Sequence, residues 1–563
     1  MRDRLRRIHT ISVLLLGLFA LAVYLLPLGG RELLRPDEFR YAEIPREMLA
    51  NGTWLSPRLN GVRYYEKPTL GYQLIALSMK CFGENAFALR LPSALATLVS
   101  AATIYLLCLK RRRDPWLPGL AAAIFLSFGI IIGIGAYAVL DPPFAAALTV
   151  CIGAVFAAYC TDRFRHEVLW LVVAGLAAAA AFMVKGFLAF IIPAVVFVPF
   201  LCWERAWKKL FRLPWLPLFI VLLITLPWAW QLHHTEPDFW RYFFIEEHWK
   251  RFTSETYDRK AQPPWYFIPI LLGGMLPSGA LWAAAWIGVG KQWLKDSFIR
   301  LLLCWAVLPF ILFSASSCKL GTYILPCFAP LALLTAVSFR RAMIVRRRLC
   351  RQIVSRMNGV FGWVFIAAAV AAALIPVVVP RFQKLPGITA TECILTTLTA
   401  VAAALFGTAL LRVRRRGIGL QTGLFLLGAA PLILVGMFAI PNAFLGNRAS
   451  AVGLQKCFQA IPVHAGCTVA VERTCIAPVC WVLKRDDIVV VGKMGEMAYG
   501  FKTYPDEYAS RYVTEAEFPG LIDRSQSGLI YITFKDLKSS PLPSGWPEPR
   551  DTVSSYGVTV MRF

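Results

Sequence analysis

The segment between residues 36 and 68 is the one long polar stretch in an otherwise apolar first half of the chain. Asp37 and Arg40 stand near its start, and it ends in Tyr64-Tyr65-Glu66-Lys67-Pro68. A carboxylate can act as a general base, and lysine and arginine can bind a phosphate group. Because apolar runs flank the segment on both sides, these residue types predict chemistry at a membrane surface on a substrate that carries phosphate and a long lipid.

Further candidate residues stand in short connections between apolar runs. Asp141 opens one run, Lys185 lies in a tight turn between two others, and Lys319 and Tyr323 share a third connection. A fourth connection holds His248 and Arg251, which would share one face of a helix because they are three residues apart. Other interpretations stay open: Asp37 and Asp141 as helix N-caps, Lys67 as an interface anchor and His248 as an ordinary surface residue.

The elements that must position these residues are membrane-spanning helices. Hydrophobic residues make up 58% of the 563 residues, above the roughly 45–50% of soluble proteins. Apolar runs long enough to cross a bilayer of about 30 Å predict about 13 transmembrane helices. These runs lie near residues 11–29, 86–109, 117–134, 142–160, 167–184, 187–203, 213–232, 264–289, 299–316, 322–339, 358–379, 393–411 and 418–440.

The basic residues report the orientation of these helices. The net charge is +26, but the lysines and arginines come in short clusters between apolar runs, which excludes the single basic face of a nucleic-acid-binding protein. With 13 spans, seven basic clusters fall on one side, which the positive-inside rule makes the cytoplasm. We therefore expect the loop at residues 30–85, the other candidate residues and the C-terminus on the external side. The clusters lie at residues 2–7, 110–113, 163–165, 205–212, 291–300, 340–356 and 412–416.

Two more structural expectations follow from local patterns. Phe39, Tyr41, Ile44 and Met48 alternate with charged residues, which predicts an interfacial amphipathic helix kinked at Pro45. From residue 441 to 563, short apolar runs separated by turn residues predict a small α/β domain, with strands near 467–471, 488–491, 528–534 and 558–562 and a helix near 449–460. Residues 1–440 then form the transmembrane domain. The four cysteines of the tail allow a disulfide in an oxidising compartment, with its pairing open.

Several of these motifs together resemble one family from end to end. They are RPDEFRYAEIPREML, YYEKP, YAVLDP, VKGFLA, DFWRYFF, KLGTYIL and LKRDDIVVVGKMGEMAYG. The chain resembles the bacterial lipid A aminoarabinose transferases, within the lipid-phosphate-dependent glycosyltransferases that include protein mannosyltransferases. The resemblance implies a GT-C type fold, meaning an all-α polytopic membrane domain with a small C-terminal α/β periplasmic domain.

The resemblance also implies an activity and a set of residues. The activity is inverting transfer of 4-amino-4-deoxy-L-arabinose from undecaprenyl phosphate to a phosphate of lipid A, in the inner membrane of a Gram-negative bacterium, with resistance to polymyxin as its consequence. The site is expected on the periplasmic side, in contact with membrane lipids. The expected catalytic residues are Asp37, Lys67 and Asp141, and the substrate-binding residues are Arg40, Tyr64, Glu66, Lys67, Lys185, Arg251, Lys319 and Tyr323.

Three points stay open at this stage. Glu66 and His248 could together bind a divalent metal ion such as zinc, although two ligands make a weak site. A glycosyltransferase that uses a polyprenyl-phosphate sugar to modify protein or another glycan would share the same loop and lysine. A lipid or drug transporter is a third interpretation, but it would carry ionisable residues within its spans, and the predicted spans are nearly free of them.

Overall fold

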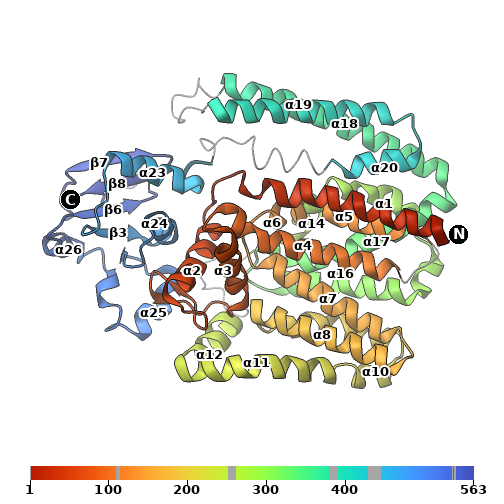
Figure 1. Ribbon diagram of the computed structural model, residues 1–563, viewed down its shortest axis with the longest axis horizontal. Coiled ribbons are helices and arrows are strands. Elements are labelled where there is room, and N and C mark those ends of the chain that lie inside the picture. Colours follow the sequence, from red (N-terminus) through yellow and green to blue (C-terminus); the bar gives the residue numbers. More distant parts are fainter. Residues whose placement is uncertain are drawn as a thin grey trace. The chain divides into compact units, whose positions relative to one another are not determined.

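The computed structural model describes residues 2–109, 114–250, 262–378, 390–428, 445–535, 537 and 541–563. It divides into two compact units (Figure 1). Unit 1 comprises residues 1–28, 90–373 and 397–437 and is a bundle of helices. Unit 2 comprises residues 29–89, 374–396 and 438–563, so that the polar first loop folds with the C-terminal residues.

Unit 1 is built almost entirely from helices whose lateral surface is apolar. Its main helices are α1 (Arg2–Ala20), α4 (Ala86–Leu109), α5 (Leu117–Leu126), α6 (Gly129–Gly135), α7 (Asp141–Tyr159), α8 (Phe164–Lys185), α9 (Leu188–Trp203), α10 (Trp207–Arg212), α11 (Trp215–Thr235), α12 (Phe239–Arg241), α14 (Phe267–Met275), α15 (Trp282–Ala285), α16 (Ser297–Ala315), α17 (Phe328–Val345), α18 (Arg347–Val378), α19 (Ala390–Val413) and α20 (Ile418–Leu426). Short π and 3₁₀ segments continue several of them, including η3 (Tyr242–Lys250) and η8 (Gly321–Cys327).

Nine helices of the described residues are long and apolar enough to cross a membrane, which supports a multi-pass membrane protein. The expected count of about 13 is not confirmed. The predicted span at 187–203 is the shorter helix α9, and the spans at 117–134 and 264–289 are each broken into short pieces. The last predicted span, 418–440, begins as α20 and then runs into residues outside the described ranges.

The breaks in these two spans lie next to each other and are joined by hydrogen bonds. The backbone N–H of Gly129 donates to the carbonyl of Leu276 at 2.7 Å, and the Ser127 and Ser278 hydroxyl oxygens lie 2.9 Å apart. In an apolar environment a helix break frees backbone groups that must be paired within the protein. Here each break supplies partners for the other, which hydropathy alone does not record.

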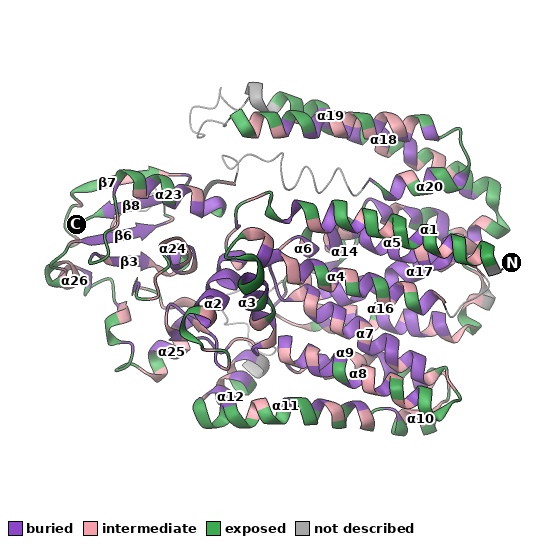
Figure 2. Ribbon diagram, in the orientation of Figure 1, coloured by how far each residue is buried: buried purple, intermediate pink, exposed green. Residues whose placement is uncertain are grey.

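The polar loop of unit 2 begins with α2 (Asp37–Asn51). Asp37 and Glu38 stand in its first turn, where carboxylates favour the helix dipole, and Gly52 ends it in the left-handed conformation with φ 68°. The expected helix is confirmed, but its charged side chains do not form the exposed polar face of an amphipathic helix. Glu38, Glu43 and Glu47 are fully buried, because α2 packs against α3 (Leu70–Phe82) and α24 (Ile476–Leu483) (Figure 2).

The C-terminal part of unit 2 contains a six-stranded mixed sheet in the order β5-β4-β3-β6-β8-β7. The strands are β3 (Thr468–Glu472), β4 (Val489–Val491), β5 (Tyr512–Val513), β6 (Leu529–Thr533), β7 (Asp551–Ser555) and β8 (Val558–Arg562). Strands β3, β4, β5 and β6 run parallel, with Val469 opposite Ile530, and β8 pairs antiparallel with both β6 and β7. The four predicted strands and the helix α23 (Ser450–Ala460) are confirmed, whereas β5 and β7 were not foreseen.

The remaining elements of unit 2 are short. A hairpin joins β1 (Arg58–Leu59) to β2 (Val62–Arg63), and α25 (Ala498–Thr503) and α26 (Phe518–Arg524) lie in the C-terminal part. Phe518 stacks on Trp546 with ring centroids 3.8 Å apart over the core residues Ala470, Tyr531 and Met561. All four cysteines of the tail are free and buried, so the disulfide that the sequence allowed is not formed.

Candidate active site

A cluster of polar side chains joins the two ends of unit 2 in sequence. Arg40 on α2 donates from Nη2 to Asp37 Oδ1 at 2.6 Å and from Nη1 to both carboxylate oxygens of Glu496 at 2.5 Å. Tyr64 donates its hydroxyl to Glu496 Oε2 at 3.2 Å. We call Asp37, Arg40, Tyr64 and Glu496 the Arg40 cluster. It unites three residues that the sequence predicted with one that it did not.

Burial divides the Arg40 cluster into an inner and an outer part. The side chains of Asp37 and Glu496 are 39% and 42% exposed, whereas that of Arg40 is 11% exposed and Tyr64 is almost completely buried. The Nε atom of Arg40 is buried and has no acceptor among the described residues. The cluster therefore presents accessible carboxylates to a ligand and holds one guanidinium N–H donor that no atom of the described residues accepts.

Electrostatics keep Arg40 charged and Tyr64 protonated. Burial disfavours the charge of Arg40, but neighbouring Tyr64 and Glu496 more than offset it and raise the pKa of the guanidinium. Burial raises the pKa of Tyr64 well above its usual value. Tyr64 therefore acts as a hydrogen-bond donor and not as a phenolate base.

The Tyr64–Pro68 motif continues directly from this cluster. Tyr65 packs against Tyr499 with ring centroids 5.9 Å apart, which anchors the motif to the segment that carries Glu496. Glu66 and Lys67 are both partly exposed, and Lys67 Nζ donates to the carbonyl oxygen of Glu66 at 2.9 Å. This contact folds the lysine back towards its own backbone.

A second layer of buried charges holds the first loop in place. Glu43 accepts two hydrogen bonds from Arg46, at 2.9 and 2.6 Å. Glu47 accepts the backbone N–H groups of Asn60 and Gly61, at 2.5 and 2.9 Å, which both have positive φ in the β1–β2 hairpin. The side chain of Asn60 in turn exchanges hydrogen bonds with the backbone of Ile488, next to β4. These contacts fix α2, and with it Arg40, on the C-terminal part of unit 2.

Unit 1 brings together three other predicted residues. Lys185 at the end of α8 pairs with Asp141 at the start of α7, with Nζ and Oδ1 2.7 Å apart. The same ammonium lies 5.4 Å from the ring centroid of Tyr323 in η8. The residue at the N-cap of α7 is Leu140, and the carboxylate of Asp141 pairs with Lys185, so the N-cap interpretation of Asp141 is wrong.

Lys319 has different hydrogen-bond partners from this pair. It is buried, and its ammonium donates to the backbone carbonyl oxygens of Gln262 and Ser316, at 2.8 Å for Gln262. Its burial lowers the pKa of the ammonium. Lys319 thus joins its own connection, after α16, to the one that contains Gln262.

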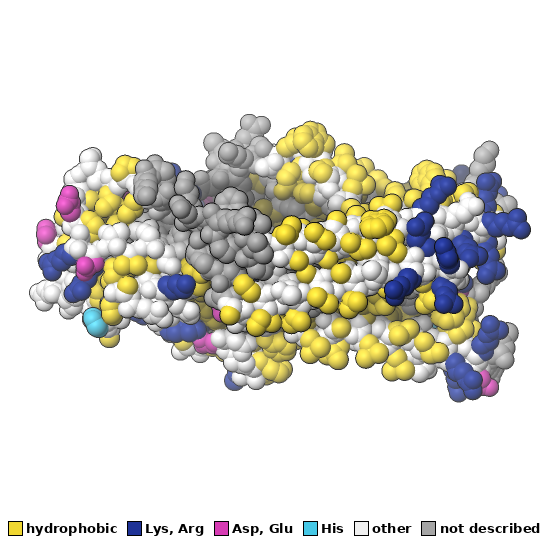
Figure 3. All heavy atoms as spheres, turned by 90° about the horizontal axis from the view of Figure 1, so that it is seen from above, with side chains coloured by type: hydrophobic (Ala, Val, Ile, Leu, Met, Phe, Trp, Pro, Cys, Tyr) yellow, Lys and Arg dark blue, Asp and Glu magenta, His cyan; other side chains and the backbone are white. Residues whose placement is uncertain are grey.

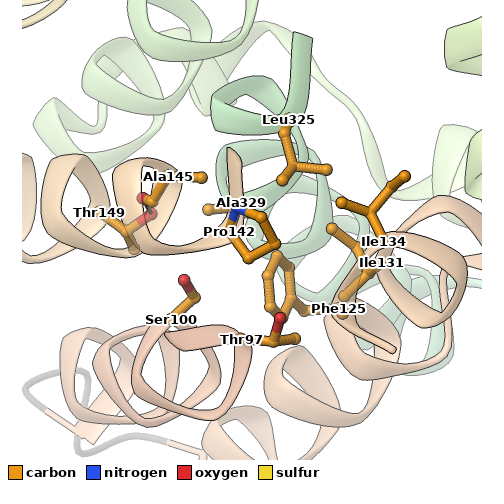
Figure 4. A pocket seen from close by; sticks show the side chains of 11 residues that line it. Thr97, Ser100, Phe125, Ile131, Ile134, Pro142, Ala145, Thr149, Leu325 and Ala329 are labelled. Carbon is orange, nitrogen blue, oxygen red and sulfur yellow. Dashed lines mark hydrogen bonds between the residues drawn. The ribbon is translucent and has the colours of Figure 1, made fainter. Parts of the chain in front are cut away.

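A small pocket opens in unit 1 beside Pro142, the residue after Asp141 (Figure 4). Three hydroxyl groups line it, but each donates to a carbonyl of its own helix: Thr97 to Ser93, Ser100 to Ala96 and Thr149 to Ala145. The rest of its wall is apolar, including Phe125, Ile131, Ile134, Leu325 and Ala329. The pocket therefore suits an apolar group.

Two predicted residues cannot be placed in either cluster. Arg251 lies outside the described residues, as does the side chain of His248, whose backbone forms part of η3. Among the described residues, no three histidine, cysteine, aspartate or glutamate side chains converge as a metal site would require. The zinc site of Glu66 and His248 stays a prediction.

Glu496 is the residue that sequence reasoning missed. It belongs to the GEMAYG part of the late motif, to which no functional role was assigned from the sequence. Its partner Arg40 is 456 residues away in sequence, so no local pattern links the two. Glu507 forms another contact between residues distant in sequence, because it pairs with Arg63 on β2 at 2.5 Å.

Comparison with known proteins identifies the family. A profile described as dolichyl-phosphate-mannose-protein mannosyltransferase matches residues 9–243, and one described as the C-terminal domain of arabinosyl transferase ArnT matches residues 465–562. The fold is similar to the crystal structure of ArnT from Cupriavidus metallidurans bound to undecaprenyl phosphate, with a TM-score of 0.76, 23% identity, and coverage of 98% of this chain and 97% of that chain.

Curated relatives match over nearly the whole length. The chain is 34% identical to the undecaprenyl phosphate-alpha-4-amino-4-deoxy-L-arabinose arabinosyl transferase of Shewanella sediminis, covering 97% of both chains. It is 36% identical to the protein of the same name from Pectobacterium atrosepticum, covering 98% of both chains. The chain therefore belongs to the family of undecaprenyl phosphate-4-amino-4-deoxy-L-arabinose arabinosyl transferases, which are integral-membrane glycosyltransferases.

Proposed function

We propose that this chain transfers 4-amino-4-deoxy-L-arabinose from undecaprenyl phosphate to a phosphate group of lipid A. The near full-length identity to the named arabinosyl transferases carries this proposal. The Arg40 cluster supports it, because it combines accessible carboxylates with a buried cation, and the partly exposed Lys67 follows Tyr64 in the same motif. Transfer of the amino sugar would lower the negative charge of the cell surface and so reduce the binding of polymyxin and other cationic peptides.

The reaction exchanges one glycosyl phosphate bond for another. The bond between the anomeric carbon and the undecaprenyl phosphate oxygen breaks, and its electron pair stays on the departing phosphate. Lys67 and Arg40 are the cations assigned to that developing charge, since a positive group placed where charge develops stabilises the transition state. The free Nε–H of Arg40 gives a phosphate or sugar oxygen a donor that no described protein atom uses.

The acceptor determines what the carboxylates must do. A phosphate monoester is already anionic at neutral pH, so its oxygen can attack the anomeric carbon without a general base. Asp37 is then free to hold the sugar, its amino group or the positive charge that develops on the ring. A single displacement of this kind inverts the anomeric carbon. No step requires a metal ion, and a zinc ion on Glu66 and His248 would polarise a bound phosphate.

The pair of Asp141 and Lys185 is assigned a supporting role in binding an anionic group. The ion pair fixes the ammonium at 2.7 Å from the carboxylate and over the Tyr323 ring. Both side chains are about nine-tenths buried, and a lysine held this way is oriented before any ligand arrives. The apolar pocket that begins at Pro142 would accept part of a lipid chain.

We place the protein in the bacterial inner membrane with unit 2 on the periplasmic side. The alternation of basic connections along the sequence supports this orientation. Reporter fusions after Lys208 and after Lys484 test it, with the first expected in the cytoplasm and the second in the periplasm. A cytoplasmic signal from the second fusion would overturn the orientation and the periplasmic site with it.

The alternative acceptor is a hydroxyl of a protein or another glycan. The match of residues 9–243 to the protein mannosyltransferase profile is the observation that favours this alternative. Purified chain incubated with the undecaprenyl phosphate donor separates the two. We expect transfer to lipid IVA and none to the same lipid after its phosphates have been removed by a phosphatase. Equal transfer to the dephosphorylated lipid or to a hydroxyl-bearing peptide would refute a phosphate acceptor.

A further inference from the structure

Seven arginines of unit 1 gather where the turn between α17 and α18 meets the turn between α19 and α20. All seven are exposed, and the side chains of unit 1 that face the viewer in Figure 3 show how lysine and arginine concentrate at one end of an otherwise apolar surface. We call this group the arginine corner; it consists of Arg346, Arg347, Arg348, Arg351, Arg414, Arg415 and Arg416.

The two halves of the corner are held together by direct contacts. Arg351 Nη2 donates to the carbonyl oxygen of Arg415 at 3.5 Å, and Ser355 Oγ donates to that of Arg414 at 3.4 Å. Gln421 Nε2 donates to the carbonyl oxygens of Arg414 and Arg416, at 3.0 and 2.8 Å. Side chains of α18 and α20 therefore hold the backbone of this turn, and its three arginines remain exposed residues.

Helix packing brings the two halves close. Gly362 on α18 and Gly407 on α19 face each other so closely that a Cβ on Gly407 would lie 2.6 Å from the Gly362 carbonyl oxygen. One turn nearer the corner, a Cβ on Gly359 would lie 3.0 Å from Cζ of Arg414, so the arginine side chain crosses the helix over this glycine. The concentration of like charge is thus built into the hairpin.

Some other basic connections of unit 1 contain an acidic partner. Arg340 pairs with Asp114 at 2.8 Å and Arg300 with Glu204 at 3.1 Å. None of the seven corner arginines forms a salt bridge with a carboxylate within the described part of the chain. Setting topology needs basic residues on one side, but it does not need them packed together without counter-charge. A group of arginines without counter-charge favours binding of an external anion. The planar guanidinium of arginine can donate two hydrogen bonds to the oxygens of one phosphate.

The surroundings identify that anion as part of an amphiphile. Ile344 and Val345, directly before the corner, are 77% and 63% exposed, and Leu349 within it is 40% exposed. Leu420 on the neighbouring α20 is 60% exposed. Apolar side chains this exposed next to a basic group are suited to acyl chains. We propose that the arginine corner binds the phosphate headgroup of an anionic membrane phospholipid.

The test measures lipids retained by the full-length protein in detergent. Native mass spectrometry after incubation with phosphatidylglycerol or phosphatidylcholine reports binding of each lipid. We expect preferential retention of phosphatidylglycerol by the unaltered protein. The triple variant Arg351→Gln, Arg414→Gln, Arg415→Gln is expected to lose about 100-fold in affinity for this lipid, because each basic residue contributes about a factor of five. A matched control removes three exposed arginines from a single helix, as Arg4→Gln, Arg6→Gln, Arg7→Gln, and is expected to retain the preference.

Three results would overturn the proposal. Equal retention of both lipids by the unaltered protein would show that the corner has no preference for anionic lipid. Equal losses in the corner variant and the control would show that only net charge matters. Displacement of the lipid by inorganic phosphate at the same concentration would show that the corner binds phosphate alone. If the glutamine variant does not insert, Arg→Lys at the same three positions keeps the charge, and its lipid preference is expected to fall because the forks are lost; an unchanged preference would refute recognition by arginine.

Discussion

Arg40 Nη1 on the first loop lies 2.5 Å from both carboxylate oxygens of Glu496 near the other end of the chain. This contact makes the C-terminal part of unit 2 a component of the candidate active site. Glu496 also accepts a hydrogen bond from Tyr64, so it links the two motifs of the loop. Removing it should therefore disturb both motifs.

Glu496→Gln is expected to reduce transferase activity by roughly 10- to 100-fold, which corresponds to loss of one charge-assisted interaction of about 1.5–3 kcal/mol. Glutamine keeps the size and one acceptor oxygen but leaves Arg40 with the charge of Asp37 alone. Turnover of purified protein measures the effect. Glu507→Gln is the control, because Glu507 pairs with Arg63 in the same unit outside the Arg40 cluster; equal activity of the two variants would contradict the role given to Glu496.

Lys67→Ala is expected to lower the rate by roughly 30- to 1000-fold, because a charge-assisted contact to a desolvated phosphate is worth about 2–4 kcal/mol. Lys67→Arg keeps the charge but replaces a compact ammonium with a larger, planar guanidinium, so partial activity is expected. Survival on polymyxin, together with the yield of extracted protein, measures both variants. If Lys67 were only an interface anchor, alanine would leave turnover within about threefold of the unaltered protein.

The sequence was a good guide where the signal is local. The motif residues Asp37, Arg40 and Tyr64 do converge, and apolar runs located β3, β4, β6 and β8 to within a residue or two. It failed where the deciding partner is distant. The charges of α2 are buried partly because α24, which is distant in sequence, packs against this helix. The breaks at Ser127 and Pro277 exist because each lies against the other and their backbones pair.

Buried Glu47 predicts how stability depends on pH. Burial, with the charge of Glu43 adding to it, raises the pKa of Glu47 to about 8, against about 4.3 in an unfolded chain. Between these values the folded protein holds a proton that the unfolded chain has lost, so stability should fall as pH rises through this window. Thermal unfolding of purified protein at several pH values measures the slope. Glu47→Gln, which mimics the protonated acid, should flatten it, and an unchanged slope would rule Glu47 out as its source.

Metal analysis tests the zinc prediction separately from activity. If Glu66 and His248 share an ion, His248→Ala should lower the zinc content of purified protein as well as its turnover. A variant at His233 on α11 serves as a control for histidine loss in general. Zinc content that is the same in the His248 variant and the unaltered protein would reduce His248 to a polar contact.

The central claim is tested most directly by the mass spectrum of lipid A. A strain that lacks its own aminoarabinose transferase but still makes the undecaprenyl phosphate donor is compared with the same strain expressing this chain or its Lys67→Ala variant. We predict that the unaltered chain adds 4-amino-4-deoxy-L-arabinose to lipid A phosphate and that the variant, present at the same level in the membrane, adds little or none. Lipid A that stays unmodified while the unaltered chain is inserted at normal levels would contradict the proposed function.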